Sequence, residues 1–240
     1  MPGYTRCVQG LRISRIGRAA LDLIYPPRCA VCGTGGVFLC ERCAGTLPRA
    51  DGRRCDRCWL PLRGVQCFAC AEHPTHIEHL RSAFRYEGGV IRLVHAFKFG
   101  SQSSLAPSLG ALLADAFERH GLEADVIVPV PLTGSRRRIR GYNQALLMAA
   151  ELSKHAGVAV TETLRRTGHG ATQAASASAE ERRRNVQGVF SVAKGQDVTG
   201  ARILLIDDVA TTGATLNACA AVLLEAGVAG VAGLTLARED

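Results

Sequence analysis

Two adjacent carboxylates beside a hydroxyl-rich turn are the residues best suited to chemistry in this chain. An apolar stretch, Arg202 to Ile206, runs into Asp207 and Asp208, and a threonine- and glycine-rich turn then leads into an expected helix. The first turn of a helix has unpaired N–H groups that attract phosphate, and Gly213 lets the backbone approach closely. The carboxylates repel phosphate, but they accept hydrogen bonds from sugar hydroxyls or help to hold Mg²⁺. Together these groups predict a pocket for a 5-phosphoribosyl group.

The predicted pocket has a sugar side and a phosphate side. Asp207 and Asp208 are the candidate catalytic residues, and the candidate phosphate-binding residues are Val209, Ala210, Thr211, Thr212, Gly213, Ala214 and Thr215. A helix N-cap cluster or a structural turn would explain either part alone. The segment has neither the glycine pattern of a dinucleotide fold nor that of a P-loop. The combination of both parts favours the phosphoribosyl pocket over a structural turn.

Eight of the ten cysteines form four pairs with two residues between the members. Two cysteines at this spacing on a tight turn direct both sulfurs to one point, and two such turns complete a tetrahedral S₄ site. Four thiolates leave no open position for water, so we expect about two zinc ions with structural roles. The predicted zinc ligands are Cys29, Cys32, Cys40, Cys43, Cys55, Cys58, Cys67 and Cys70.

The alternative for these cysteines is a disulfide framework, which suits secreted domains. No export signal is recognisable at the N-terminus, and zinc is therefore favoured. Sequential pairing, with the first four cysteines on one ion, is the simplest arrangement, although spacing alone also permits an interleaved one. His73, His76 and His79 follow closely and are interpreted as ordinary loop residues rather than ligands. Cys219 lies in an apolar helical stretch and is interpreted as a buried small hydrophobe.

Composition indicates the fold class. The chain has 240 residues, of which 47% are hydrophobic and only 5% aromatic. That length suits one α/β domain with a small extra module, and a core of Val, Leu, Ile and Ala suits a parallel sheet flanked by helices. Strand and helix patterns alternate after the cysteines. We expect strands at 83–86, 124–129, 158–161, 188–192, 202–206 and 231–236, and helices at 88–99, 104–119, 142–156 and 215–226.

The net charge of +8 favours anionic partners such as nucleic acid or phosphorylated metabolites, with a solvated arginine-rich surface as the alternative. No apolar run approaches the ~18 residues that span a bilayer, so we expect a cytoplasmic protein with no membrane span. Residues 11–24 favour a short amphipathic helix that packs on its own protein. A basic helix that contacts a membrane surface or DNA is the alternative.

The combined pattern resembles the ComF family, the competence-linked proteins also called ComFC or competence protein F. Residues 203–215 are similar to the phosphoribosyl pyrophosphate motif of type I phosphoribosyltransferases, and the resemblance covers about 26–238. One departure lies at Gly170 and Ser176, where the family usually has Thr and Leu. Besides the paired cysteines and the pocket, the matching segments are Leu93 to Phe99, Val128 to Leu132, Arg136 to Gln144 and Glu181 to Val186.

The resemblance implies an N-terminal arm at 1–25, a double zinc ribbon at 26–75 and a type I phosphoribosyltransferase-like domain at 82–240. It implies a closing flap near 167–185, a segment that the residues alone leave open as a hinged loop or an exposed helix. It also implies a pyrophosphate-holding loop, for which a solvated basic loop is the alternative. The matching positions are Val130, Pro131, Leu132, Arg136, Arg138 and Arg140, with Lys98 as a weaker candidate.

The implied activity is displacement of pyrophosphate from C1 of phosphoribosyl pyrophosphate, with Mg²⁺ and a nitrogenous acceptor. The implied biological role is DNA uptake in competence, on incoming single-stranded DNA together with a DNA-import helicase. Two other hypotheses stay open at this point. One is a non-catalytic single-strand-binding factor whose pocket is vestigial or senses a nucleotide, and the other is a salvage or amide-type phosphoribosyltransferase.

Overall fold

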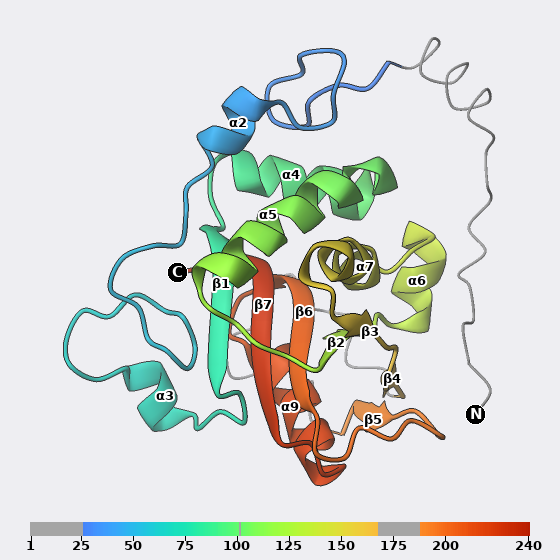
Figure 1. Cartoon of the computed structure of the whole chain (residues 1–240). Coiled ribbons are helices and arrows are strands. Elements are labelled where there is room, and N and C mark those ends of the chain that lie inside the picture. The colour runs from blue at the N-terminus through green and yellow to red at the C-terminus, as the bar shows by residue number, and fades with distance from the viewer. Residues whose placement is uncertain (1–25, 101, 168–187) are drawn as a thin grey trace.

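A five-stranded parallel sheet forms the centre of the structure. The computed structural model describes residues 26–100, 102–167 and 188–240. Within these ranges the strand order is β1-β7-β6-β2-β3, and each neighbouring pair is parallel (Figure 1). The predicted α/β class is confirmed. The strands are β1 (His79–Arg85), β2 (Val126–Pro129), β3 (Ala159–Val160), β6 (Arg202–Ala210) and β7 (Gly230–Arg238).

Helices cover both faces of this sheet (Figure 1). One core cluster packs three helices on one face, and a second cluster packs a single helix on the other. Ile203, Leu204, Leu205 and Ile206 are buried, because a parallel strand covered on both sides has no solvent face. The three helices are α4 (Gly89–Phe99), α5 (Ala106–Arg119, after the 3₁₀ turn η1 at Ser103–Leu105) and α7 (Gln144–Ala156), and the single helix is α9 (Ala214–Glu225).

A short helix and a two-stranded sheet lie outside the five-stranded sheet, although Leu164 and Phe190 of the two-stranded sheet pack in the second core cluster. α6 (Gly134–Arg140) follows β2, and β4 (Leu164–Arg166) pairs antiparallel with β5 (Phe190–Val192). Sequence patterns predict neither α6 nor β4. β4 has only three residues, and α6 is arginine-rich with no buried side chain, so neither carries an apolar period.

The cysteine-rich residues form two small units, one ending in α2 (Glu41–Gly45) and the other in α3 (Phe68–Glu72). The chain between the units runs beside the outer edge of β1. The Ala50 N–H donates to the Ala83 carbonyl at 3.1 Å, and the Arg85 N–H donates to the Pro48 carbonyl at 2.8 Å. The cysteine-rich segment therefore covers an edge of the sheet that would otherwise expose unpaired backbone groups.

Two boundaries differ by more than two residues from the sequence predictions. β1 begins at His79, and β6 continues past Ile206 as far as Ala210, so the twin carboxylates lie inside the strand rather than after it. The helix predicted at 11–24, and nearly all of the flap predicted at 167–185, fall outside the described residues. Among the helices that are described, none combines the length and the apolar character needed to cross a membrane.

Candidate functional site

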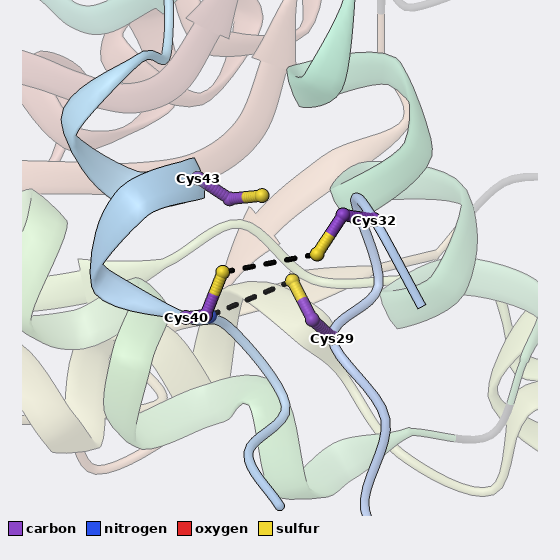
Figure 2. A group of neighbouring side chains, drawn as sticks. All are labelled: Cys29, Cys32, Cys40 and Cys43. Atoms are coloured by element: carbon purple, nitrogen blue, oxygen red, sulfur yellow. Dashed lines mark hydrogen bonds between the residues drawn. The ribbon is translucent and has the colours of Figure 1, made fainter. Parts of the chain in front are cut away.

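Each cysteine-rich unit brings four sulfurs together. Cys29, Cys32, Cys40 and Cys43 form one group (Figure 2), Cys55, Cys58, Cys67 and Cys70 form the other, and the sulfurs within each group lie within 4.8 Å of one another. This confirms the sequential pairing. The histidines that follow belong to neither group, and Cys219 is fully buried in α9 as predicted.

The sulfur geometry fits zinc. Zn–S bonds of about 2.3 Å in a tetrahedron place sulfurs roughly 3.8 Å apart. The Cys32–Cys40 sulfurs are 3.8 Å apart, Cys55–Cys70 3.7 Å and Cys58–Cys67 3.5 Å. All nine cysteines in the described ranges are free thiols. The described residues therefore contain none of the disulfides that the alternative framework would require.

The two units share one knuckle design. In each, the residue after the second cysteine donates its N–H to the carbonyl of the first at 2.8 Å, and this residue has a positive φ. Gly33 supplies φ 79° in the first unit, as predicted, whereas Trp59 supplies φ 60° in the second. A left-handed tryptophan is strained. Its ring is buried under Arg81, whose guanidinium lies 4.5 Å from the ring centroid. The packing of this ring fixes the second unit against the sheet.

The carboxyl end of β6 is open on one side. β2 pairs with β6 only as far as Pro129, opposite Ile206, and the chain then turns away after the Val130 N–H donates to the Ile206 carbonyl at 2.9 Å. Asp207 to Ala210 therefore pair with β7 alone. Proline ends β2 here because it has no N–H for the ladder, and the early end of β2 leaves a gap beside the two aspartates.

Asp207 and Asp208 lie in this gap with different partners. Asp208 is 8% exposed, and its carboxylate forms an ion pair with Lys98 Nζ at 2.8 Å. The Asp207 carboxylate accepts the Asp208 N–H at 2.8 Å. Removal of water around Asp207, reinforced by the neighbouring negative charge of Asp208, raises the pKa of Asp207 to about 7. The site thus holds two adjacent carboxylates, of which Asp208 is ion-paired with a lysine and Asp207 has a raised pKa.

Two further arginines face the acids. Arg140, from α6, donates to the Gln144 side chain at 3.0 Å, and its guanidinium lies 5.1 Å from the Phe99 ring centroid. Its burial lowers its pKa, which the charges of Asp208 and Asp207 oppose. Arg166 of β4 is also near enough to Asp207 to lower the pKa of that carboxyl. Sequence reasoning missed Arg166, because nothing in the sequence links β4 to the end of β6.

Apart from Lys98 of α4, the residues predicted to hold pyrophosphate lie in helix α6 and in the connection that leads into it. Arg136 and Arg140 are four residues apart and share a face of α6. The positive charge of Arg136 contributes to lowering the pKa of both Arg140 and Arg166. Arg138 lies between them on another side of the helix. Val130, Pro131 and Leu132 form the connection from β2 to α6. Thr133 then caps α6, accepting the Arg136 N–H at 3.2 Å, while Gly141 ends the helix with φ 77°.

The predicted phosphate residues form the turn between β6 and α9. Val209 and Ala210 end the strand, Thr211 to Gly213 make the turn, and Ala214 and Thr215 begin α9. Gly213 has φ 76°, and at the helix start the Ala214 N–H donates to Thr212 Oγ1 at 3.3 Å. The turn residues are partly exposed, so the helix N-terminus remains accessible to an anion.

This turn also borders a cavity. A space of about 570 Å³ lies between the second cysteine unit and α9, and its lining includes Thr212, Gly213, Ala214 and Asn217. That volume falls within the range of small-molecule sites, roughly 300–1,000 Å³. The turn is therefore accessible from the side of the cysteine-rich unit as well.

Comparison with known proteins matches both parts of the chain. The double zinc ribbon domain model matches residues 20–72, and the phosphoribosyl transferase domain model matches residues 102–239. Competence protein F of Haemophilus influenzae is 32% identical, over 84% of this chain and 97% of its own length. The DNA utilization protein YhgH of Escherichia coli K12 is 32% identical over 87% and 96%.

Similarity extends to a more distant curated protein and to solved structures. Competence protein ComFC of Bacillus subtilis is 28% identical over 83% of this chain and 84% of its own. Among solved structures, the glutamine phosphoribosylpyrophosphate amidotransferase of B. subtilis is similar at 21% identity and a TM-score of 0.41, over 59% of this chain and 30% of that one. The sulfur groups, the sheet and these matches agree: the chain belongs to the ComF family, in which a double zinc ribbon precedes a phosphoribosyltransferase domain.

Proposed function

We propose that this protein binds phosphoribosyl pyrophosphate with Mg²⁺ and transfers the phosphoribosyl group to a nitrogenous acceptor. The observation that carries the proposal is the pair of carboxylates at the end of β6, which faces Lys98 and Arg140 and is followed at once by the start of α9. This arrangement brings three kinds of group together. The carboxylates can accept hydrogen bonds from sugar hydroxyls, the cations can hold a pyrophosphate leaving group, and the N–H groups of the helix start can bind a phosphate.

Each part of the ligand has a complementary group. The ribose hydroxyls donate to Asp207 and Asp208, and the 5′-phosphate accepts from the N–H groups and hydroxyls between Thr211 and Thr215. The pyrophosphate contacts Arg136, Arg140 and Lys98. Lys98 then exchanges Asp208 for a phosphate oxygen, which leaves Asp208 free for the sugar.

The two carboxylates also fit the role of Mg²⁺ ligands. Mg²⁺ in nucleotide sites is held by one or two carboxylates together with substrate phosphates, and Asp207 and Asp208 are the carboxylates in this gap. When bound, the ion neutralises the charge that develops on the departing pyrophosphate.

The reaction exchanges one bond for another at C1 of the ribose. The bond from C1 to the pyrophosphate oxygen breaks and its electron pair leaves with pyrophosphate, while the acceptor nitrogen forms the new bond to C1 and releases its proton to water. The sugar is positively charged in between, and the carboxylates of Asp207 and Asp208 stabilise that charge by their position. The arginines of α6 hold the leaving group in line.

The direct test is pyrophosphate release from phosphoribosyl pyrophosphate, screened over nitrogenous bases, with calorimetry of binding in parallel. Asp207→Asn combined with Asp208→Asn is expected to abolish binding, since both sugar acceptors lose their charge, and to leave the circular dichroism spectrum unchanged. The matched control is Asp115→Asn, which removes an exposed carboxylate on α5 that pairs with Arg49 and Arg119. Unchanged ligand binding by the double variant would refute the assignment of the pocket.

A second candidate function is binding of single-stranded DNA. Phe99 is 64% exposed and Ile139 is 83% exposed, and Arg140 lies over the Phe99 ring. An exposed ring beside arginines suits base stacking next to phosphate contacts. The names of the curated relatives, competence protein and DNA utilization protein, support a link to DNA.

Salt dependence tests this second function. Binding of an oligothymidylate through the arginines of α6 is expected to weaken steeply as salt rises, and Phe99→Ala to weaken binding by about fivefold or more because a stacked base is worth about 1–3 kcal/mol. A flat salt response, or no effect of Phe99→Ala, would exclude this surface.

A further inference from the structure

Arg238, the last residue of β7, joins the second zinc ribbon to the phosphate turn. Its side chain is fully buried. Nε donates to the Cys58 carbonyl at 3.0 Å, and Nη1 donates to the Ala210 carbonyl at 2.9 Å and to the Thr211 carbonyl. Cys58 is a zinc ligand, whereas Ala210 and Thr211 lead into the turn that receives phosphate. One guanidinium therefore holds the backbone of both sites.

The backbone of Arg238 is fixed on both sides. The residue pairs with Ala210 of β6 and with Arg85 of β1. Its carbonyl accepts the Tyr86 N–H at 2.7 Å, and the following N–H, of Glu239, donates to the Ala210 carbonyl at 3.0 Å. With the main chain held in the ladder, the position of the guanidinium depends on its acceptors, and two of these, at Ala210 and Thr211, lie where β6 passes into the turn.

A buried guanidinium also requires negative charge nearby. Within residues 26–100, 102–167 and 188–240, no carboxylate forms an ion pair with Arg238, and Asp240 pairs with Arg54 instead. Because each thiolate carries one negative charge, a Zn²⁺ held by four of them is an anionic centre. The loaded second site supplies this charge beside Cys58.

A second contact joins the same ribbon to the helix side of the turn. Asn217 of α9 accepts the His76 N–H at 2.6 Å and the Thr75 hydroxyl at 3.0 Å through its Oδ1. The first ribbon differs, since its Val31 side chain packs against Gly89 at the start of α4. Only the second of the two described zinc sites is thus tied to both ends of the turn.

We propose that the second zinc site positions the phosphate turn through Arg238, so that zinc at this site and a phosphoribosyl ligand at the turn stabilise each other. The inference rests on the proposed function, because it assigns a regulatory element to the same pocket. Coupling between two sites is reciprocal. A ligand at the turn is therefore expected to tighten zinc binding at the second site, and so to lower the population in which its thiols are open to reaction, while the first site, which Arg238 does not contact, is expected to be unaffected.

The test is pulse alkylation of the full chain carrying two zinc ions, with and without phosphoribosyl pyrophosphate and Mg²⁺, and mass spectrometry of each cysteine. An alkylating agent is used because a chelator would also remove Mg²⁺ from the ligand. The ligand is expected to slow modification of Cys55, Cys58, Cys67 and Cys70 by about fivefold or more. The cysteines of the first site serve as the internal control and keep their rates.

Variants then test the role of the guanidinium. Arg238→Met is expected to retain both zinc ions by metal analysis, to bind the ligand about tenfold more weakly, and to lose the protection of the second site. Arg54→Met is the matched control. It breaks a bidentate pair between the ribbon and Asp240, at 2.7 and 2.8 Å, without touching the turn, and should keep both properties. Arg238→Lys keeps the charge but lacks the planar guanidinium that donates to several carbonyls at once. Its ligand affinity and its protection of the second site are expected to be intermediate.

The outcomes separate the two proposals. If calorimetry detects ligand binding to the unmodified chain, but the two cysteine groups are protected equally or not at all, the coupling is wrong and the proposed function stands. The same holds if Arg54→Met loses the protection as fully as Arg238→Met. Absence of any binding overturns both proposals. The alkylation of the unmodified chain decides the question even where Arg238→Met does not fold.

Discussion

At the scale of single residues, the surroundings of Asp207 strongly raise the pKa of its carboxyl. Its pKa rises from the ordinary 3.8 to about 7, through lost hydration and the charge of Asp208. A raised pKa in the folded state means that the folded protein binds the proton more tightly than the unfolded chain. This contribution to stability is therefore fully present below pH 3.8 and is lost as the pH rises through about 7.

Asp207→Asn should remove this pH dependence in the ligand-free protein. The amide keeps an oxygen for the Asp208 N–H but carries no charge, so the free energy of unfolding at pH 8 should rise by about 1–3 kcal/mol. Denaturant unfolding at pH 5 and pH 8 measures the change, which should be small at pH 5. Asp125→Asn is a suitable contrast, because hydrogen bonds from Arg202 lower the pKa of Asp125. Equal effects of Asp207→Asn at both pH values would show that the pKa of Asp207 is ordinary.

At the scale of elements, α6 determines where the predicted pyrophosphate arginines point. The helix has seven residues and no buried side chain, so its two end signals, the Thr133 cap and Gly141, hold it in place. An N-cap is worth about 1 kcal/mol, a large share of the stability of so short a helix.

Thr133→Ala should therefore fray α6 without unfolding the protein. We expect faster amide exchange at 134–140, and weaker binding of phosphoribosyl pyrophosphate by about threefold to tenfold, since Arg136 and Arg140 would no longer be fixed. Thr133→Ser keeps the capping oxygen and should restore both properties. Faster exchange with unchanged affinity would mean that the arginines of α6 do not contact the ligand.

The elements also show what the sequence can and cannot predict. The cysteine groups and the β6–α9 turn are local patterns, in which spacing alone brings the groups together, and the sequence predicts both, although it ends β6 four residues too early. Thr133 and Gly141 are equally local signals for α6. The arginine-rich segment between them has no apolar period, however, and such a period is the main sequence signal for a helix. The contacts of Lys98 with Asp208 and of Arg238 with Cys58 join distant segments. Tertiary packing alone creates them, and a strained Trp59 in place of glycine has no signal in a single sequence.

At the scale of the whole molecule, the zinc ribbons act as a cover for the sheet. β7 pairs with one edge of β1, and the segment from Pro48 to Arg57 lies along the other through hydrogen bonds to Leu80, Ala83 and Arg85. The cysteine-rich units on either side of this segment have small apolar cores of their own, so metal binding supplies much of their folding free energy.

Removal of zinc should therefore expose the outer edge of β1. We expect a chelator to cause concentration-dependent association, measured by light scattering, while far-ultraviolet circular dichroism retains most of its signal, because the sheet and its four covering helices do not include the ribbons. Renewed zinc should reverse the change if it is added before aggregates mature. A chelated protein that stays monomeric, with Ala83 and Arg85 amides still protected from exchange, would show that the segment holds the edge of β1 without its zinc.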